Sequence, residues 1–285
     1  RLENEAISAL HHDQITLDIG NPIKVSIGQF YGIEINDFAV TVAKTALWIA
    51  ESQMMNETED VVHMSLDFLP LRSYANIVEG NALRLDWESV VDKMKLDYIM
   101  GNPPFVGHQW RSKEQASDLE NACKDIPKCG KLDYVCGWYN KATNFMQGTT
   151  IHAAFVSTNS IAQGESVGIL WPVLFKKSVE IEFAYRSFVW TSEAKDKAAV
   201  HCVIVGFTCG GGTKEKSIYE SGVKKTVSHI NGYLVDAPDV FIQSRGKVLT
   251  KGLPEMSKGS QPTDGGDLIL TPDERAELVN KYPAA

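Results

Sequence analysis

Short apolar runs that alternate with helical segments constrain the fold of this chain more than any other feature of its sequence. Strands are expected at residues 30–35, 76–81, 96–100, 153–159, 180–188 and 199–208. Helices are expected after a cap at Asn36 or Asp37, with apolar residues at 38, 42, 46, 49 and 50, and at 134–146 and 164–175, the last interrupted by Pro172. Strands joined by helical crossovers predict an α/β fold with a mostly parallel, doubly wound, Rossmann-like sheet.

Polar residues stand at or just past the ends of several expected strands, namely Glu34, Asn81, Asn102 and Asn159. Ligands of a doubly wound sheet bind beyond the carboxyl ends of its strands. We therefore expect these side chains at one edge of the sheet, in a common binding site.

Length and composition limit the class of protein. The 285 residues, of which 44% are apolar, suffice for one large α/β domain and part of a second. No strongly apolar stretch approaches the roughly 20 residues of a membrane span, and the N-terminal residues lack the features of a signal peptide. The sequence therefore predicts a cytoplasmic protein that does not act on membranes.

The cysteine pattern and the net charge bear on ligands. The five cysteines are scattered and form no Cys-x-x-Cys pair, so we expect neither a disulfide framework nor a metal site. The net charge of −8 argues mildly against nucleic-acid binding, because neutralising phosphates requires clustered Lys and Arg. Local basic clusters are nevertheless present, and only the face toward a nucleic acid must be basic.

The residue composition of the chain changes after Cys209, where a run of glycines begins a region rich in Gly, Pro and Asp. We expect one domain over residues 1–209 and the beginning of a second over 210–285. Near the end, Thr271 is expected to cap a helix, with Pro272 in its first position and Glu274 completing a capping box.

Asn102-Pro103-Pro104-Phe105, directly after an expected strand, carries the clearest chemistry. The exocyclic amine of adenine is a poor nucleophile because its lone pair is delocalised into the ring. The Asn102 side-chain carbonyl and a backbone carbonyl held rigid by the prolines can each accept one amine hydrogen and expose that lone pair. Phe105 offers an aromatic face to a base flipped out of the duplex. A plain strand-to-loop turn is the alternative interpretation.

Several separated segments resemble one known family, and Asn-Pro-Pro-Phe resembles motif IV of the amino-methyltransferases. In the order of that family, these segments are Gly32–Ile35, Glu79–Ala82, Leu132–Tyr139, Phe155–Ile161 and Ala198–Ile204. They are similar to the MmeI-like DNA methyltransferases. The resemblance covers roughly residues 20–208 as a Rossmann-like methyltransferase domain, and the rest is similar to the start of the family's target-recognition domain.

The resemblance implies an enzyme that transfers a methyl group from S-adenosylmethionine to N6 of adenine in double-stranded DNA, with no metal required. Many members of the family are joined to a nuclease in one restriction-modification polypeptide. Asn102, Pro103, Pro104 and Phe105 correspond to the catalytic motif, and Asn102 also lies beside the cofactor.

The cofactor would be held, by the same resemblance, through Glu34, Ile35, Asn81 and Ala82. Glu34 corresponds to the acid that accepts both ribose hydroxyls, and Ile35 would pack on the cofactor's adenine. Asn81 stands where Asp is frequent, and an amide oxygen accepts the same hydrogen bond. The alternative for Glu34 is a charge that interacts with the dipole of the following helix.

Contacts with the target are implied for two aromatic residues and several basic ones. Phe188 and Trp190 correspond to a late aromatic motif that stacks on the flipped base, although buried aromatic residues of a terminal strand are equally compatible with the sequence. Lys113, Arg186 and Lys195 are candidates for phosphate contacts, and a solvated surface is the alternative for each.

One departure from the family concerns the glycine-rich loop that should precede Glu34, because no Gly-x-Gly occurs there. We interpret the chain as a fragment that lacks the first strand and its loop, and we expect it to be inactive by itself. Enzymes of the same fold that act on protein glutamine, RNA guanine or cytosine N4 remain alternatives. An inactive DNA-binding remnant is a further one.

Overall fold

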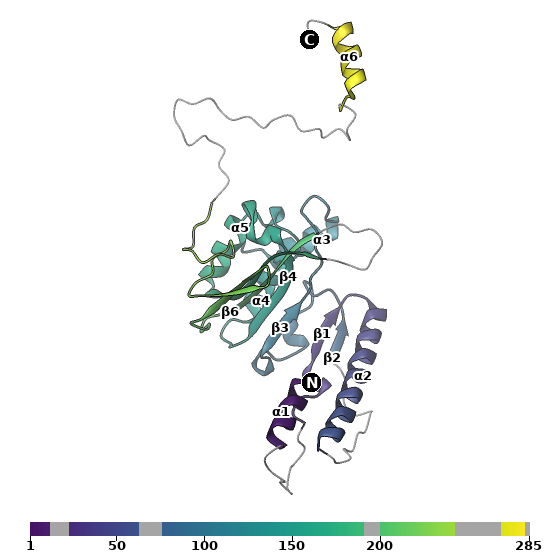
Figure 1. The fold of residues 1–285 in the computed structure, drawn as a ribbon, viewed down its shortest axis with the longest axis vertical. Coiled ribbons are helices and arrows are strands. Elements are labelled where there is room, and N and C mark those ends of the chain that lie inside the picture. The colour runs from purple at the N-terminus through teal and green to yellow at the C-terminus, as the bar shows by residue number, and fades with distance from the viewer. Residues whose placement is uncertain (12–22, 63–75, 191–199, 243–268, 283–285) are drawn as a thin grey trace. The chain divides into compact units, whose positions relative to one another are not determined.

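The computed structural model describes residues 1–11, 23–62, 76–190, 200–242 and 269–282 (Figure 1). Its helices are α1 (Leu2–His11), α2 (Asp37–Val62), α3 (Lys113–Ala122), α4 (Cys136–Phe145), α5 (Gly164–Lys176) and α6 (Pro272–Lys281). Its strands are β1 (Tyr31–Glu34), β2 (Asn76–Glu79), β3 (Tyr98–Gly101), β4 (His152–Thr158), β5 (Val179–Trp190), β6 (Val200–Cys209), β7 (Lys216–Glu220) and β8 (Val223–Val227). The chain divides into two compact units, Arg1–Gln243 and Ser244–Ala285.

The strands of the first unit form a parallel pair, β1–β2, and a six-stranded sheet in the order β3-β4-β6-β5-β7-β8. In the larger sheet β3, β4, β5 and β7 run in one direction, while β6 and β8 run in the other. The predicted α/β fold with a mostly parallel sheet is confirmed. The carboxyl ends of β3, β4 and β5 consequently point the same way.

The hydrophobic core lies between the six-stranded sheet and helices α4 and α5, which Figure 1 shows along it. Tyr139 of α4 is fully buried and packs on Phe155 of β4 and Phe207 of β6, with ring centroids 5.2 Å and 5.3 Å away. Trp171 of α5 closes the same cluster at 6.1 Å from Tyr139. Alternate residues of β4 are buried, as expected for a strand that presents one face to this core.

Helix α2 begins after Asn36, whose side-chain oxygen accepts the Ala39 amide N–H at 2.9 Å, as one of the two expected caps requires. The apolar face expected from residues 38, 42, 46, 49 and 50 is exposed, however, and Val40 and Thr58 are the buried residues of this helix. The helix carries apolar residues on two faces, so periodicity could not determine which one packs against β1 and β2.

Pro172 does not interrupt α5, contrary to the expectation, because the helix continues from Gly164 to Lys176. A proline inside a helix costs roughly 3 kcal/mol through a lost hydrogen bond and a clash with the carbonyl four residues earlier. Burial of Leu170, Trp171 and Leu174 around the proline offsets that cost.

The hairpin β7–β8 was not expected, and it extends the sheet beyond Cys209. The domain boundary expected between Cys209 and residue 210 stays a prediction. In the second unit, the Thr271 hydroxyl accepts the Glu274 amide N–H and the Glu274 carboxylate accepts the Thr271 amide N–H. The predicted capping box of α6 is confirmed. Among the described residues, no helix is both long and apolar enough to cross a membrane.

Candidate functional site

The loop Asn102–Phe105 follows β3 directly, at the carboxyl end of that strand. β3 pairs in parallel with β4, with Gly101 opposite Phe155. The Asn102 side chain is exposed and makes no hydrogen bond with any residue that the structure describes, whereas Pro103 is buried. The loop thus presents a free amide on a backbone anchored by a buried proline.

The residue after this loop, Val106, is tied to the segment before α4. The Tyr134 amide N–H donates to the Val106 carbonyl at 3.0 Å, and the Val106 amide N–H donates to the Asp133 carboxylate at 3.3 Å. The other carboxylate oxygen of Asp133 accepts the Thr158 hydroxyl at 3.1 Å. The sequence did not single out Asp133 for this role, because Val106 and Thr158 lie 25 or more residues away from it in the chain.

Glu34 is the last residue of β1, and Asn81 lies two residues after the end of β2 in the smaller sheet. The Gly80 amide N–H donates to the Glu34 carbonyl at 2.8 Å, so the two strand ends lie side by side. The Glu34 carboxylate accepts the Asn36 amide N–H at 3.1 Å, and the adjacent Ile35 side chain is 69% exposed. An acidic group and an accessible apolar side chain therefore lie together at the carboxyl end of β1.

The turn after β2 is held by a buried carboxylate. Asn81 donates from its side-chain amide to Asp118 at 2.8 Å and accepts the Leu83 amide N–H at 2.9 Å, while Ala82 accepts the Trp87 indole N–H at 2.9 Å. Asp118 also pairs with Arg84 at 2.6 Å, and this contact raises the pKa of the guanidinium. The Asn81 amide is thus already engaged in fixing the turn, with one lone pair of its oxygen remaining for a ligand.

Asp118 links the two halves of the site, since the Tyr134 hydroxyl also donates to it, at 3.4 Å. Burial raises the pKa of the Tyr134 hydroxyl, and the neighbouring Asp118 charge raises it further. Tyr134 in turn holds Val106 through its backbone. A series of hydrogen bonds therefore runs from the Asn81 turn to Val106, the residue that follows the Asn102–Phe105 loop. Asp118, which lies within it, was not predicted from the sequence.

The residues predicted to contact the target lie elsewhere on the same unit. Phe188 and Trp190 are in β5, opposite Cys202 and Val200 of β6. They lie near the carboxyl end of β5, which is on the same side of the sheet as the carboxyl ends of β3 and β4. Lys113 is exposed at the start of α3, just after the Ser112 cap. Lys195 lies outside the described residues. The structure thus brings the aromatic pair to the expected edge of the sheet, and their role stays a prediction.

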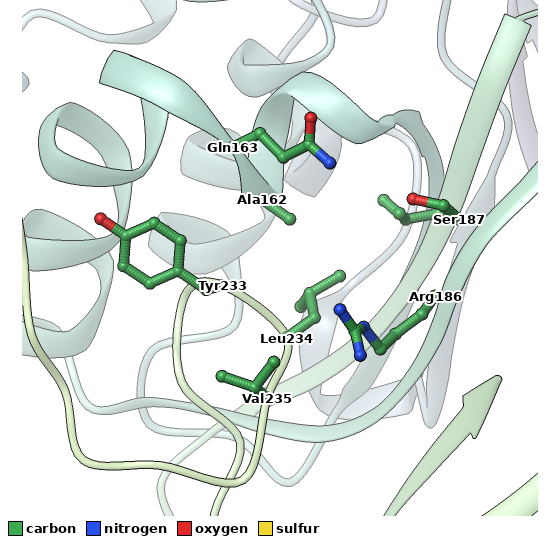
Figure 2. A pocket seen from close by; sticks show the side chains of 8 residues that line it. Ala162, Gln163, Arg186, Ser187, Tyr233, Leu234 and Val235 are labelled. Carbon is green, nitrogen blue, oxygen red and sulfur yellow. The ribbon is translucent and has the colours of Figure 1, made fainter.

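A pocket of about 230 Å³ opens beside this edge, between the turn after β4, strand β5 and residues 233–235 (Figure 2). Its lining is Ala162, Gln163, Arg186, Ser187, Val203, Tyr233, Leu234 and Val235. Arg186, a candidate for phosphate contacts, pairs with Glu220 at 3.0 Å. The pocket is polar on the sides of Gln163, Ser187 and Arg186 and apolar at Leu234.

The cysteines are all free thiols, and the described residues contain no group of three or more His, Cys, Asp or Glu suited to a metal ion. Cys123 and Cys136 are fully buried. Burial raises the pKa of Cys123 to about 12 and that of Cys136 well above its ordinary value. Because the thiolate is the reactive form, both side chains should be inert in the native protein.

We therefore expect a thiol reagent at about pH 8, near the ordinary thiol pKa, to leave Cys123 and Cys136 unlabelled in the folded chain and to label both in denaturant. Peptide mapping by mass spectrometry distinguishes the individual positions. Rapid labelling of either residue in the native state would show that its thiol is not buried.

Comparisons with known proteins agree with this geometry. Residues 1–220 match the family model described as MmeI, DNA-methyltransferase domain, and residues 236–285 match MmeI, target recognition domain. DNA methyltransferase A of Bacillus subtilis (strain 168) is 41% identical over 262 residues, which are 91% of this chain and 30% of that protein.

A solved structure, that of the type IIL restriction-modification enzyme MmeI in complex with DNA, superposes with a TM-score of 0.88 at 39% identity. The match covers 99% of this chain and 38% of the MmeI chain, so the chain spans well under half the length of these relatives. The polar loop at the end of β3 and both family matches lead to the same assignment. The chain belongs to the MmeI family of DNA methyltransferases.

Proposed function

We propose that the full-length protein carrying this chain is a site-specific DNA methyltransferase that transfers a methyl group to N6 of a flipped adenine. The observation that carries this proposal is the Asn102–Phe105 loop at the carboxyl end of β3, with its accessible amide and buried Pro103. Membership of the MmeI family supports it. The DNA in the MmeI complex and the match to a target recognition domain support double-stranded DNA as the partner.

Each residue of the loop has a separate role toward the target amine. The Asn102 side-chain carbonyl and the Pro103 backbone carbonyl each accept one amine hydrogen, which draws the nitrogen toward tetrahedral geometry and exposes its lone pair. Pro103 and Pro104 fix the backbone, and proline donates no competing hydrogen bond. Phe105, half-buried in the loop, stacks on the flipped base. Positioning of the amine supplies most of the barrier reduction in this scheme.

The cofactor we propose is S-adenosylmethionine, held by Glu34, Ile35, Asn81 and Ala82. The chemistry of this set fits: a carboxylate accepts the two ribose hydroxyls, an exposed apolar side chain packs on an adenine ring, and the fixed turn offers an amide oxygen. When bound, the cofactor supplies a methyl group on a strongly electrophilic sulfonium. The donor set contains no residue that would require a metal.

A further strand with a glycine-rich loop is part of the proposal for the cofactor site. Within the described residues β1 pairs only with β2, and β3 pairs only with β4, so each has an unpaired edge. Tyr98 and Met100 of β3 are 68% and 80% exposed. A strand between these edges would complete the site. The association of MmeI with restriction-modification supports a fused or associated nuclease in the same system.

Replacement of Glu34 tests the cofactor assignment. Glu34→Gln should weaken binding of S-adenosylmethionine to the full-length protein about tenfold, because hydrogen bonds to a charged group are worth about 1.5–3 kcal/mol and the amide keeps one acceptor. Titration calorimetry measures the dissociation constant. Glu57→Gln, the same change at an exposed position of α2, is the control and should leave it unchanged. Equal dissociation constants for wild type and Glu34→Gln would contradict the assignment.

The proposed reaction is tested with the full-length protein and cofactor carrying a labelled methyl group. Label should enter double-stranded DNA that contains the recognition sequence, and neither RNA nor protein should acquire it. Incorporation into RNA or protein instead of DNA would assign the loop to another planar amine or amide.

A further inference from the structure

We infer that Asp133 is a positioning residue that holds the target-amine loop against the end of β4; this inference rests on the proposed function. One of its carboxylate oxygens accepts the amide N–H groups of Val106 and Val135, both at 3.3 Å, and the other accepts the Thr158 hydroxyl at 3.1 Å. A single side chain thus joins the loop after β3, the last residue of β4 and the start of α4.

Because Asp133 is buried, its carboxylate needs these hydrogen bonds to compensate for its lost hydration. The residue is only 8% exposed, and no ion pair within the described part of the chain includes it. A buried carboxylate is costly unless hydrogen bonds compensate for the lost hydration. The N-terminus of α4 supplies part of the compensation through Val135. The contacts with Val106 and Thr158 supply the rest, and a helix cap alone would require neither.

The consequence for the loop follows from its two attachments. On one side, Asn102 directly follows β3 and Pro103 is buried. On the other side, Val106 is held by the Asp133 carboxylate and by the Tyr134 backbone. Since Thr158 ends the strand that pairs in parallel with β3, the Asp133 carboxylate fixes the loop relative to the sheet. A displacement of about 1 Å at such a position can cost a factor of 10² in rate.

Asp125 provides a matched control. Its carboxylate is also tied to α4, where it accepts the Asn140 side-chain amide N–H at 2.8 Å, and it pairs with Lys177. Lys177 directly follows α5 and stands two residues before β5 begins, at the end of the sheet opposite the loop. Loss of either acid removes buried or half-buried polar contacts with α4 or its start, but only Asp133 contacts Val106, the residue that follows the loop.

The experiment uses the full-length protein as wild type, Asp133→Ala, Asp133→Asn and Asp125→Ala. With saturating DNA and cofactor, Asp133→Ala should lower kcat by about 10- to 100-fold and leave KM for the cofactor within about twofold. Asp133→Asn should recover kcat to within about threefold of wild type, because its amide accepts from Val106 and donates to Thr158. Asp125→Ala should lower the unfolding midpoint with kcat within about twofold of wild type.

Hydrogen exchange of peptides covering residues 102–110 adds a readout that does not depend on activity. Asp133→Ala should accelerate exchange of the Val106 amide, and Asp125→Ala should not. If wild type methylates no DNA, the proposed function fails, while this exchange measurement still tests the attachment of the loop.

An unchanged kcat in Asp133→Ala, or a loss that Asp125→Ala reproduces in full, would overturn the inference. If Asp133→Ala does not fold, Thr158→Val takes its place. This change removes the contact between Thr158 and Asp133, together with the 2.7 Å hydroxyl contact between Thr158 and Ser160, and leaves the Val106 and Val135 contacts of Asp133 intact. It should lower kcat roughly fivefold without changing KM for the cofactor, and wild-type kcat in that variant would likewise overturn the inference.

Discussion

Asn102→Ala should abolish methyl transfer by the full-length protein, with kcat lowered at least about 10³-fold, while the fold remains intact. Removal of one preorganised hydrogen-bonding group at a reacting centre typically costs a factor of 10²–10³. Here the loss is expected at or beyond the upper end, because the amide is the side-chain acceptor for the amine. Single-turnover kinetics with saturating DNA and cofactor isolate the chemical step.

The structure predicts that this change leaves stability unaffected. The Asn102 side chain is exposed and makes no hydrogen bond with any described residue, so the free energy of unfolding should change by less than about 0.5 kcal/mol. Asn121→Ala, at an exposed position of α3, is the matched control and should keep wild-type kcat. Methylation of duplex DNA by Asn102→Ala at the wild-type rate would refute the role of the loop.

Trp171→Ala should lower the free energy of unfolding by about 3–5 kcal/mol, more than any other substitution proposed for this protein. The indole is fully buried, packs 5.5 Å from the Phe175 ring, and donates to the Ile161 carbonyl at 2.8 Å. Gly232 approaches it so closely that a Cβ there would lie 2.7 Å from the indole. The indole therefore holds α5, the turn after β4 and residues around 232 together.

Trp171→Phe separates packing from the hydrogen bond. It retains an aromatic ring but leaves the Ile161 carbonyl without its donor, so about 1–3 kcal/mol should be lost, less than in Trp171→Ala. Urea unfolding of the chain followed by far-ultraviolet circular dichroism measures both variants. A loss below about 1 kcal/mol in Trp171→Ala would mean that the cluster around Tyr139 does not form the core.

The fold was largely predictable because short apolar strands and their polar ends are local signals. The strand before Asn102 and the prolines after it determine where β3 ends, whatever the rest of the chain does. The hairpin β7–β8 was missed because its strands carry lysines and follow a run of glycines. Its turn at Ser221 and Gly222, with φ of 51° and 80°, corresponds to a Ser-Gly pair that was visible in the sequence.

The candidate site was predictable only in part, for a different physical reason. Asn102 and Glu34 could be recognised because Asn102 directly follows β3 and Glu34 is the last residue of β1. Asp118 and Asp133 act through residues far away in the chain, and nothing in their immediate neighbourhood distinguishes a buried acid from a surface one. The exposed face of α2 shows the same limit, since a helix with two apolar faces does not reveal which of them a sheet covers.

The identity of the methylated base shows whether the Asn102–Phe105 loop acts on adenine. Duplex DNA incubated with the full-length protein and S-adenosylmethionine is digested to nucleosides and analysed by mass spectrometry. The Asn102–Phe105 loop predicts N6-methyladenine as the product, absent when Asn102→Ala replaces the wild type. N4-methylcytosine, or no methylated nucleoside from a folded protein that binds both DNA and cofactor, would rule out adenine methylation by this loop.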